Sequence, residues 1–315
     1  MIKKAGLFIL VIMIAGSLWA GARSEPSSAG AAQPLRVGIM PDADSLPFMV
    51  AADQGLFDKA GVKAELINFS NPQERDAALQ AGRLDGAISD LLAAAFFAAG
   101  GFDFRVTSLT DGRYGIVGSS ALGITKLEDL RGKRIALSVN TIIQYTVDAQ
   151  LKAAGVSMTE YEAVAVPRMP LRLEMVLEGQ IEAASVPEPL LTAAVAQGAN
   201  LLSTTDTTGI DAGVLLFSKK TIDSRTNDIR AFYRAYYEAA RLINANPDSF
   251  RNYLVEKAGF PEAVKDAYRF TEYRRPSLPE RSQIISALDW LKARGLLEAD
   301  LKPEDLIDSA AISEW

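Results

Sequence analysis

Gly82-Arg83-Leu84-Asp85-Gly86-Ala87 and Gly179-Gln180-Ile181-Glu182-Ala183-Ala184 are two copies of one phrase, placed 97 positions apart. Each copy follows an amphipathic segment and leads into a short apolar strand. The first strand ends at Asp90 and the second at Glu188, and an apolar helix opens after each acid. Two α/β units built alike and joined face to face leave a cleft between them. This plan suits a protein that closes on a small molecule.

The composition excludes several classes of function. The chain has 315 residues, which suffice for two domains with their own cores. Its net charge of -6 argues against a nucleic-acid partner, because such a partner requires a basic surface. The absence of Cys and His excludes a thiol nucleophile, a disulfide, a Cys/His zinc site and a Ser-His-Asp triad. EF-hand, Walker and dinucleotide-binding motifs are also missing, although the composition leaves a metal site with oxygen ligands possible. We expect no metal, no cofactor and a protein that performs no chemistry.

The N-terminus is typical of an exported protein. Lys3 and Lys4 precede an apolar run over 7–15, and small residues precede a cleavage point after Ala22. We therefore predict a signal peptide over 1–22, a flexible leader over 23–34 and a periplasmic or extracytoplasmic location. The alternative is an uncleaved anchor, although nine apolar residues are short for a bilayer that needs about 20. Ala22 stands where a lipoprotein signal requires Cys, so no lipid anchor of that kind can form.

Strands and helices alternate through both units, which predicts parallel-rich sheets with helices on both faces. In the first unit we expect strands over 35–40, 62–69, 84–89 and 104–109 and helices over 48–59, 72–81 and 91–99. The second unit begins near Tyr114, and a strand over 213–218 returns to the first sheet. The tail is expected to pack on the first unit through helices over 228–245, 247–258, 261–269, 279–293 and 303–309. We thus predict lobe I over 35–110 and 213–315 and lobe II over 111–212. The chain crosses between the lobes twice, at 110–114 and 205–212, and these two crossings are expected to form a hinge.

At this point the chain resembles a known family, the periplasmic solute-binding proteins of ABC importers. The branch is the one that captures nitrate, sulfonates, taurine or the pyrimidine precursor of thiamine. The resemblance is carried by the order and spacing of LPF (46–48), GLFDKAGV (55–62), ALQAGRLD (78–85) and LEDLRGKRIA (127–136). It implies a two-lobed, type II-like binding-protein fold with a ligand cleft between the lobes. It also implies a monomer that delivers its ligand to an ABC permease with its ATPase and meets the membrane only through them.

Ligands of open α/β sheets lie outside the carboxyl ends of the strands, so the loops there supply the candidate ligand-binding residues. They are Asp42, Asp44, Ser45, Leu46, Phe48, Ser89, Asp90, Thr110, Asp111, Arg113, Ser138, Asn140, Thr141, Arg168, Met169 and Glu188. Structural roles are the alternative for several of them. Asn140 or Thr141 can cap the following helix, Asp90 and Glu188 can favour a helix dipole, and Phe48 can belong to the core.

The charge of these candidates bears on the ligand. Five acids stand against two arginines, which favours a neutral or amine-bearing metabolite, such as a pyrimidine, over a bare anion. A sulfonate-like ligand remains the alternative. Many relatives carry Trp-Glu-Pro where this chain has Pro187-Glu188-Pro189, so an aromatic that could stack on a flat ring is missing.

Two other functions fit the same scaffold. One is a ligand sensor that signals to a receptor. The other is an enzyme resembling the pyrimidine synthases, which consume a histidine and carry a Cys-rich motif; this chain has neither residue.

Overall fold

The first sheet is built from both ends of the chain. The computed structural model describes residues 33–313, so the predicted signal peptide and nearly all of the predicted leader lie outside the described residues. The strand order is β2-β1-β3-β10-β4, with β1 parallel to both of its neighbours and β10 antiparallel to both of its own. The strands of the first sheet are β1 (Leu35–Ile39), β2 (Ala64–Asn68), β3 (Gly86–Asp90), β4 (Phe104–Leu109) and β10 (Gly213–Ser218).

The second sheet repeats this plan. Its order is β7-β6-β8-β5-β9, and β6 is parallel to its neighbours while β5 is antiparallel to its own. Each sheet therefore takes one antiparallel strand from the segment that has just crossed from the other sheet. The strands of the second sheet are β5 (Tyr114–Gly118), β6 (Arg134–Leu137), β7 (Glu162–Ala165), β8 (Ala183–Pro187) and β9 (Asn200–Thr204).

The repeated phrase has the same structural task in each sheet. Asp85 accepts hydrogen bonds from the backbone N–H and side chain of Arg36, and Glu182 accepts the matching set from Arg134. Each arginine also donates to a backbone carbonyl at the start of the phrase. In each sheet, an acid in the connection before one strand thus pairs with an arginine in the neighbouring strand and holds those two segments together. The repeat in the sequence is a repeat in the fold.

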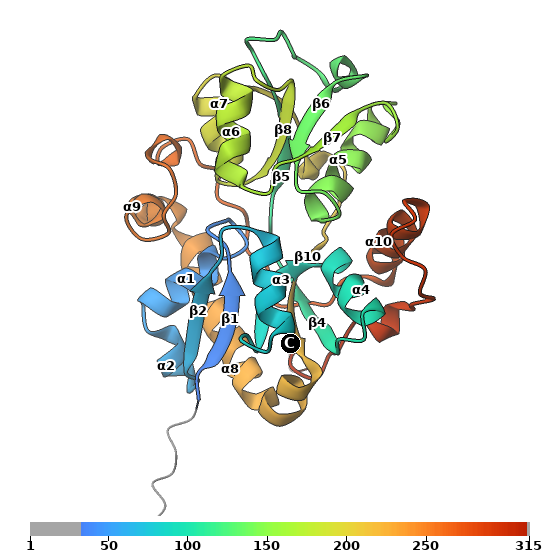
Figure 1. The fold of residues 1–315 in the computed structure, drawn as a ribbon. Helices are drawn as coiled ribbons and strands as arrows, with labels where there is room; N and C mark the ends of the chain where they lie inside the picture. Colours follow the sequence, from blue (N-terminus) through green and yellow to red (C-terminus); the bar gives the residue numbers. More distant parts are fainter. Residues whose placement is uncertain (1–32, 314–315) are drawn as a thin grey trace, which may run out of the picture. The chain divides into compact units, whose positions relative to one another are not determined.

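Helices cover both faces of the first sheet, because alternate residues of its strands face opposite sides. Leu215 and Phe217 of β10 belong to one hydrophobic cluster, and Val214 and Leu216 belong to the other. The first cluster includes α1, α2 and α8, which pack on one another, and the second includes α3 and α4 (Figure 1). The helices are α1 (Leu46–Asp53), α2 (Leu56–Ala60), α3 (Pro72–Gln80), α4 (Leu91–Ala99) and α8 (Lys219–Ala245).

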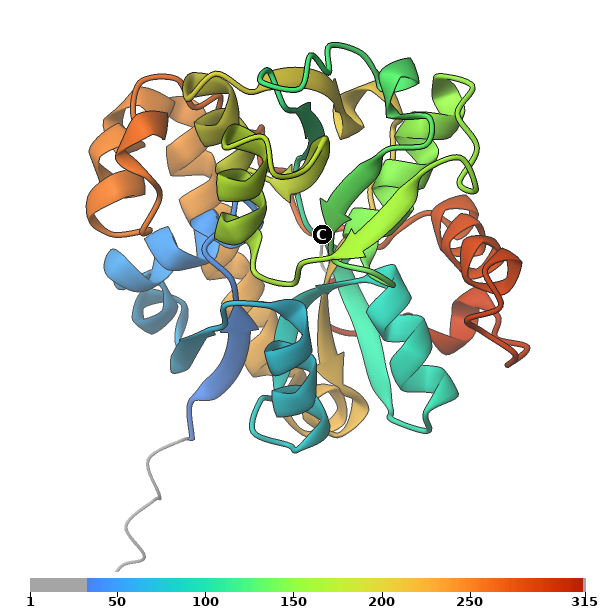
Figure 2. The same cartoon turned by 45° about the horizontal axis from the view of Figure 1, so that its top comes forward.

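The second sheet is also covered on both faces, by α6 and α7 on one side and by α5 on the other (Figure 2). These helices are α5 (Ile142–Ala153), α6 (Met169–Leu177) and α7 (Leu190–Ala196). Side chains at the strand ends cap several helices. Asn71 accepts from the Glu74 N–H at 2.9 Å ahead of Pro72, Asp90 accepts from Ala93 at 2.8 Å, and Thr141 accepts from Ile143 at 3.2 Å.

The structure corrects three predicted helices. The helix expected over 48–59 is split into α1 and α2 at Gly55, whose φ of 65° is left-handed. The segments 261–269 and 303–309 contain only short 3₁₀ turns, η4 (Glu262–Val264) and η5 (Pro303–Asp305). The remaining 3₁₀ turns and tail helices are η1 (Leu127–Leu130), η2 (Thr205–Thr207), η3 (Pro247–Phe250), α9 (Arg251–Glu256) and α10 (Arg281–Ala293).

The sequence predicts that the tail packs on the first unit. In the structure the tail packs on the second sheet as well. Helix α10 packs against α4 of the first sheet, while Trp290 and Arg294 on α10 donate hydrogen bonds to Asp148 on α5. The turn η4 also packs against α7 of the second sheet. The tail therefore braces both sheets. Residues from Pro34 on form one compact unit, and the predicted lobe boundaries stay a prediction.

Candidate ligand-binding site

A small buried cavity lies where the carboxyl ends of strands from both sheets meet. Its volume is about 30 Å³. Seven of the predicted residues line it, drawn from the loop after β1, the end of β3, the end of β6 and the starts of α5 and α6. They are Asp42, Asp44, Ser89, Asp90, Ser138, Thr141 and Met169.

The two acids after β1 are held in place by hydrogen bonds. Asp42 accepts from the Ser45 N–H at 3.0 Å, and Asp44 accepts from the Thr110 hydroxyl and from the Tyr114 hydroxyl at 3.1 Å. Burial, together with the charge of Asp44, raises the pKa of Asp42 to about 8. Burial likewise raises the pKa of Asp44 to about 6, against the hydrogen bonds that lower it. This wall of the cavity can thus hold carboxyl groups in both protonation states near neutral pH.

The third acid joins the two sheets. One oxygen of Asp90 caps α4, and its Oδ2 accepts from the N–H of Ile142 at the start of α5 at 3.3 Å. Burial raises the pKa of Asp90, while the charge of Arg75 and the two backbone N–H groups oppose the rise. Next to it, the Ser89 hydroxyl is buried and has no hydrogen-bond partner within residues 33–313. A buried hydroxyl that lines a cavity without a partner is available to a ligand.

Sequence reasoning missed eight residues of the cavity wall. They are Met40, Pro72, Arg75, Ile88, Tyr114, Ile142, Ile143 and Pro187. Most of them are apolar or lie within strands and helices, whereas the prediction considered mainly polar residues in the loops after the strands.

Arg75 was the missed residue with a detectable signal, because Arg172 follows it at the 97-residue spacing of the repeated phrase. Arg75 donates to the carbonyl of Ile88 at 3.0 Å, and Arg172 donates to the carbonyl of Ser185 at 2.9 Å. The two carbonyls are themselves 97 positions apart. The two arginines are therefore equivalent positions of the duplicated plan.

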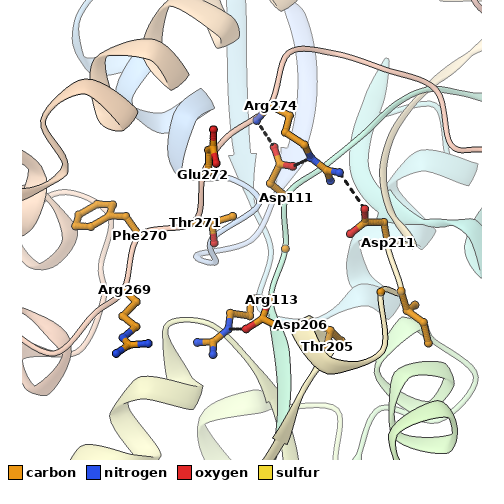
Figure 3. Close-up of a pocket in the computed structure, with 13 residues that line it drawn as sticks. Asp111, Arg113, Thr205, Asp206, Asp211, Arg269, Phe270, Thr271, Glu272 and Arg274 are labelled. Atoms are coloured by element: carbon orange, nitrogen blue, oxygen red, sulfur yellow. Dashed lines mark hydrogen bonds and ion pairs between the residues drawn. The ribbon is translucent and has the colours of Figure 1, made fainter. Parts of the chain in front are cut away.

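Two predicted residues, Asp111 and Arg113, line a different pocket of about 430 Å³ at the crossing segments (Figure 3). Arg274 lies between Asp111 and Asp211 and bonds both, at 2.5 and 3.0 Å. Arg113 bonds Asp206 at 2.6 Å. These ion pairs tie the two crossings to each other and to the tail.

The other predicted residues lie outside the cavity wall. Leu46 is buried, and Phe48 stacks on Phe232 and Tyr236 at centroid distances of 5.2 and 4.6 Å, as its core alternative proposed. Ser45 and Thr110 support the two acids after β1.

The remaining three lie around the second sheet. Glu188 pairs with Arg113 at 2.8 Å and accepts from the Thr192 N–H at 3.0 Å. Asn140, at φ 59°, donates its backbone N–H to Gln144. Arg168 lines a separate surface groove beside α6. Ligand contact stays a prediction for every residue of the set.

No three acids within residues 33–313 are grouped closely enough to hold a metal ion. None of the helices described there is both long and apolar enough to span a bilayer.

A known protein family matches most of this architecture. The family described as "NMT1/THI5 like" matches residues 42–250, which include all but one of the strands and most of the cavity wall. The chain belongs to this family. The match confirms the resemblance to the periplasmic substrate-binding proteins noted from the sequence motifs.

Individual proteins give the same result. A protein of Brachyspira hyodysenteriae named as an ABC transporter periplasmic binding protein is 24% identical over 247 residues, covering 70% of this chain and 68% of its own length. The alkanesulfonate-binding protein of Xanthomonas axonopodis pv. citri, solved with MOPS, is similar at a TM-score of 0.73 and 22% identity, covering 89% of this chain and 99% of its own. The ligand-binding component of an ABC-type import system from Staphylococcus aureus, solved with zinc, reaches 0.77 at 16% identity, covering 90% and 98%. The fold is that of periplasmic binding proteins.

Proposed function

We propose that this chain is the extracytoplasmic solute-binding component of an ABC importer. It captures a small polar organic metabolite, carries out no chemistry on it, and delivers it to a permease with its ATPase. The observation that carries the proposal is the duplicated sheet plan with a buried polar cavity lined from both sheets. The family and its binding-protein relatives support the same function.

Capture requires a hinge. A cavity of about 30 Å³ has room for one or two water molecules and for no organic metabolite. A ligand therefore enters only when the two sheets separate, and it is enclosed when they close again. The crossings at 110–114 and 205–212 are the segments that bend, with 35–110 and 213–315 moving as one lobe and 111–212 as the other. The bonds from Trp290 and Arg294 to Asp148 join these two lobes and have to break when the lobes separate. The ion pairs of Arg274 keep the two crossings together during this motion.

The ligand is neutral or carries an amine. Asp42, Asp44 and Asp90 supply three buried carboxyl groups, which accept N–H groups of a ligand or share a proton with it. A pyrimidine with an amino group meets these requirements. An alkylsulfonate would place its negative charge beside three acids in a site that excludes water, which is unfavourable.

The first test is to measure the mass of any ligand that the purified protein retains. Native mass spectrometry of protein purified without unfolding would give the mass of a retained ligand. Calorimetry with an aminopyrimidine and an alkylsulfonate then separates the classes, and we expect heat of binding for the first only. Tight binding of the sulfonate without a response to the pyrimidine would reverse the ligand assignment. Chemical conversion of any bound compound would refute the binding-protein function itself.

A further inference from the structure

The carboxylate of Asp90 is bound by the N-termini of two helices that belong to different sheets. Its Oδ1 accepts from Ala93 in the first turn of α4 at 2.8 Å, and its Oδ2 accepts from Ile142, the first residue of α5, at 3.3 Å. The N-terminus of a helix carries about half a positive charge and free N–H groups. Such a place binds the oxygens of phosphate, sulfate or carboxylate groups. Here the protein's own side chain fills it.

A buried positive charge contacts Ser138, one of the residues that line the cavity. Arg172 is fully buried and, among the described residues, has no carboxylate partner. It donates instead to the carbonyls of Val166, Ser185 and Pro167 and to the hydroxyl of Ser138, which lines the cavity. Its equivalent in the first sheet, Arg75, has Asp76 at 2.8 Å. The second sheet therefore brings the start of α5 to the cavity with no acid of its own in the cavity wall, and Arg172 lies behind that wall with its guanidinium on the Ser138 hydroxyl.

The cavity also has an unused polar group beside Asp90. Ser89 is 6% exposed, lines the cavity and has no hydrogen-bond partner for its hydroxyl within residues 33–313. Ser89 and Ile142, the first residue of α5, both line this cavity. The N–H groups of Ala93 and Ile142 and the Ser89 hydroxyl are thus donors that an oxyanion could use, but the Asp90 carboxylate already occupies the two N–H groups.

We infer that Asp90 is the specificity-determining residue of this cavity: its carboxylate acts as a built-in anion that excludes anionic ligands, and its removal creates a site for a small oxyanion. The inference rests on the proposed function in taking this cavity as the ligand site. It deepens that function by naming the residue that keeps sulfonate-type ligands out.

The experiment uses sulfate and methanesulfonate as probes, at constant ionic strength in chloride buffer, with calorimetry as the readout. Asp90→Ala frees both N–H groups and the space of the carboxylate, and we expect it to bind either probe at least tenfold more tightly than the wild type. Asp90→Asn keeps the size of the side chain and removes only the charge, so it should show a smaller gain in the same direction. Asp129→Asn is the matched control, because it removes one acid that lies on the surface and bonds Thr125 and Lys126.

The inference is overturned if neither Asp90 variant binds the probes more tightly than the wild type, or if Asp129→Asn gains as much as they do. Saturable binding of methanesulfonate by the wild type at the level of the variants would overturn it too. Thermal unfolding identifies the folded variants, and Asp90→Asn carries the test should Asp90→Ala not fold. The probes are inorganic sulfate and a simple sulfonate, so a failure to find the natural ligand leaves this comparison intact and bears on the proposed function alone.

Discussion

Replacement of Asp148 by Asn should loosen the connection between the tail and the second sheet. Asp148 lies on α5 with its side chain 6% exposed and accepts from Trp290 Nε1 at 2.7 Å, from Arg294 Nε at 2.9 Å and from Tyr161 at 2.8 Å. Asn can accept fewer of these bonds and has no charge. Loss of one partner of a buried ion pair costs about 3–5 kcal/mol. Because Arg294 is 20% exposed and water can reach it, we expect a loss of about 2–3 kcal/mol in the free energy of unfolding.

The assay is urea unfolding followed by circular dichroism and by tryptophan emission. Trp290 donates to the carboxylate that the variant replaces, so its emission should also change in the folded state before any unfolding occurs. Glu160→Gln is the control, since the Glu160–Arg131 pair lies on the surface with side chains 41% and 46% exposed, and it should cost under about 1 kcal/mol. Equal and small losses in both variants would refute the bracing role given to α10.

Three further outcomes follow from the buried groups. The raised pKa of Asp42, about 8, means that the folded state binds more protons than the unfolded state from about pH 4 to 8, so the free energy of unfolding should fall as pH rises through that range; Asp42→Asn should flatten the fall in a urea titration, and an unchanged slope would contradict the shift. Gly86→Ala should destabilise the first sheet by about 1–3 kcal/mol, because the new Cβ would lie 2.3 Å from the ring of Phe217; a thermal midpoint equal to the wild type would refute that contact. Arg172→Met should cost at least about 3 kcal/mol by leaving buried acceptors without a donor, whereas Arg168→Met on the surface should cost little, and similar unfolding curves for the two would argue against it.

The duplicated plan could be predicted from the sequence because the repeated phrase has a local signal. An acid after the turn and alternating apolar residues mark the strand, and Pro and Asn mark the helix starts. The return of the 213–218 strand to the first sheet was also predicted, since a strand after the second unit has to pair with an open edge or gap.

Other features depend on contacts between distant residues and leave no local signal. The break at Gly55 was missed because the apolar pattern continues through it. Arg75 has the local sequence pattern of a solvated helix position although it is buried, and only its match to Arg172 at the 97-residue spacing distinguishes it in the sequence. The bond from Ile142 to Asp90 joins residues 52 positions apart in different sheets, so no motif could have placed it in the sequence.

The central claim is that two equivalent sheet units close on a small ligand. Small-angle scattering of the protein during a metabolite screen tests it most directly, guided by any mass retained in native mass spectrometry. At least one compound should reduce the radius of gyration and shift the curve toward a more compact particle in a saturable manner. Curves that stay the same for every compound, including one shown to bind, would contradict the account.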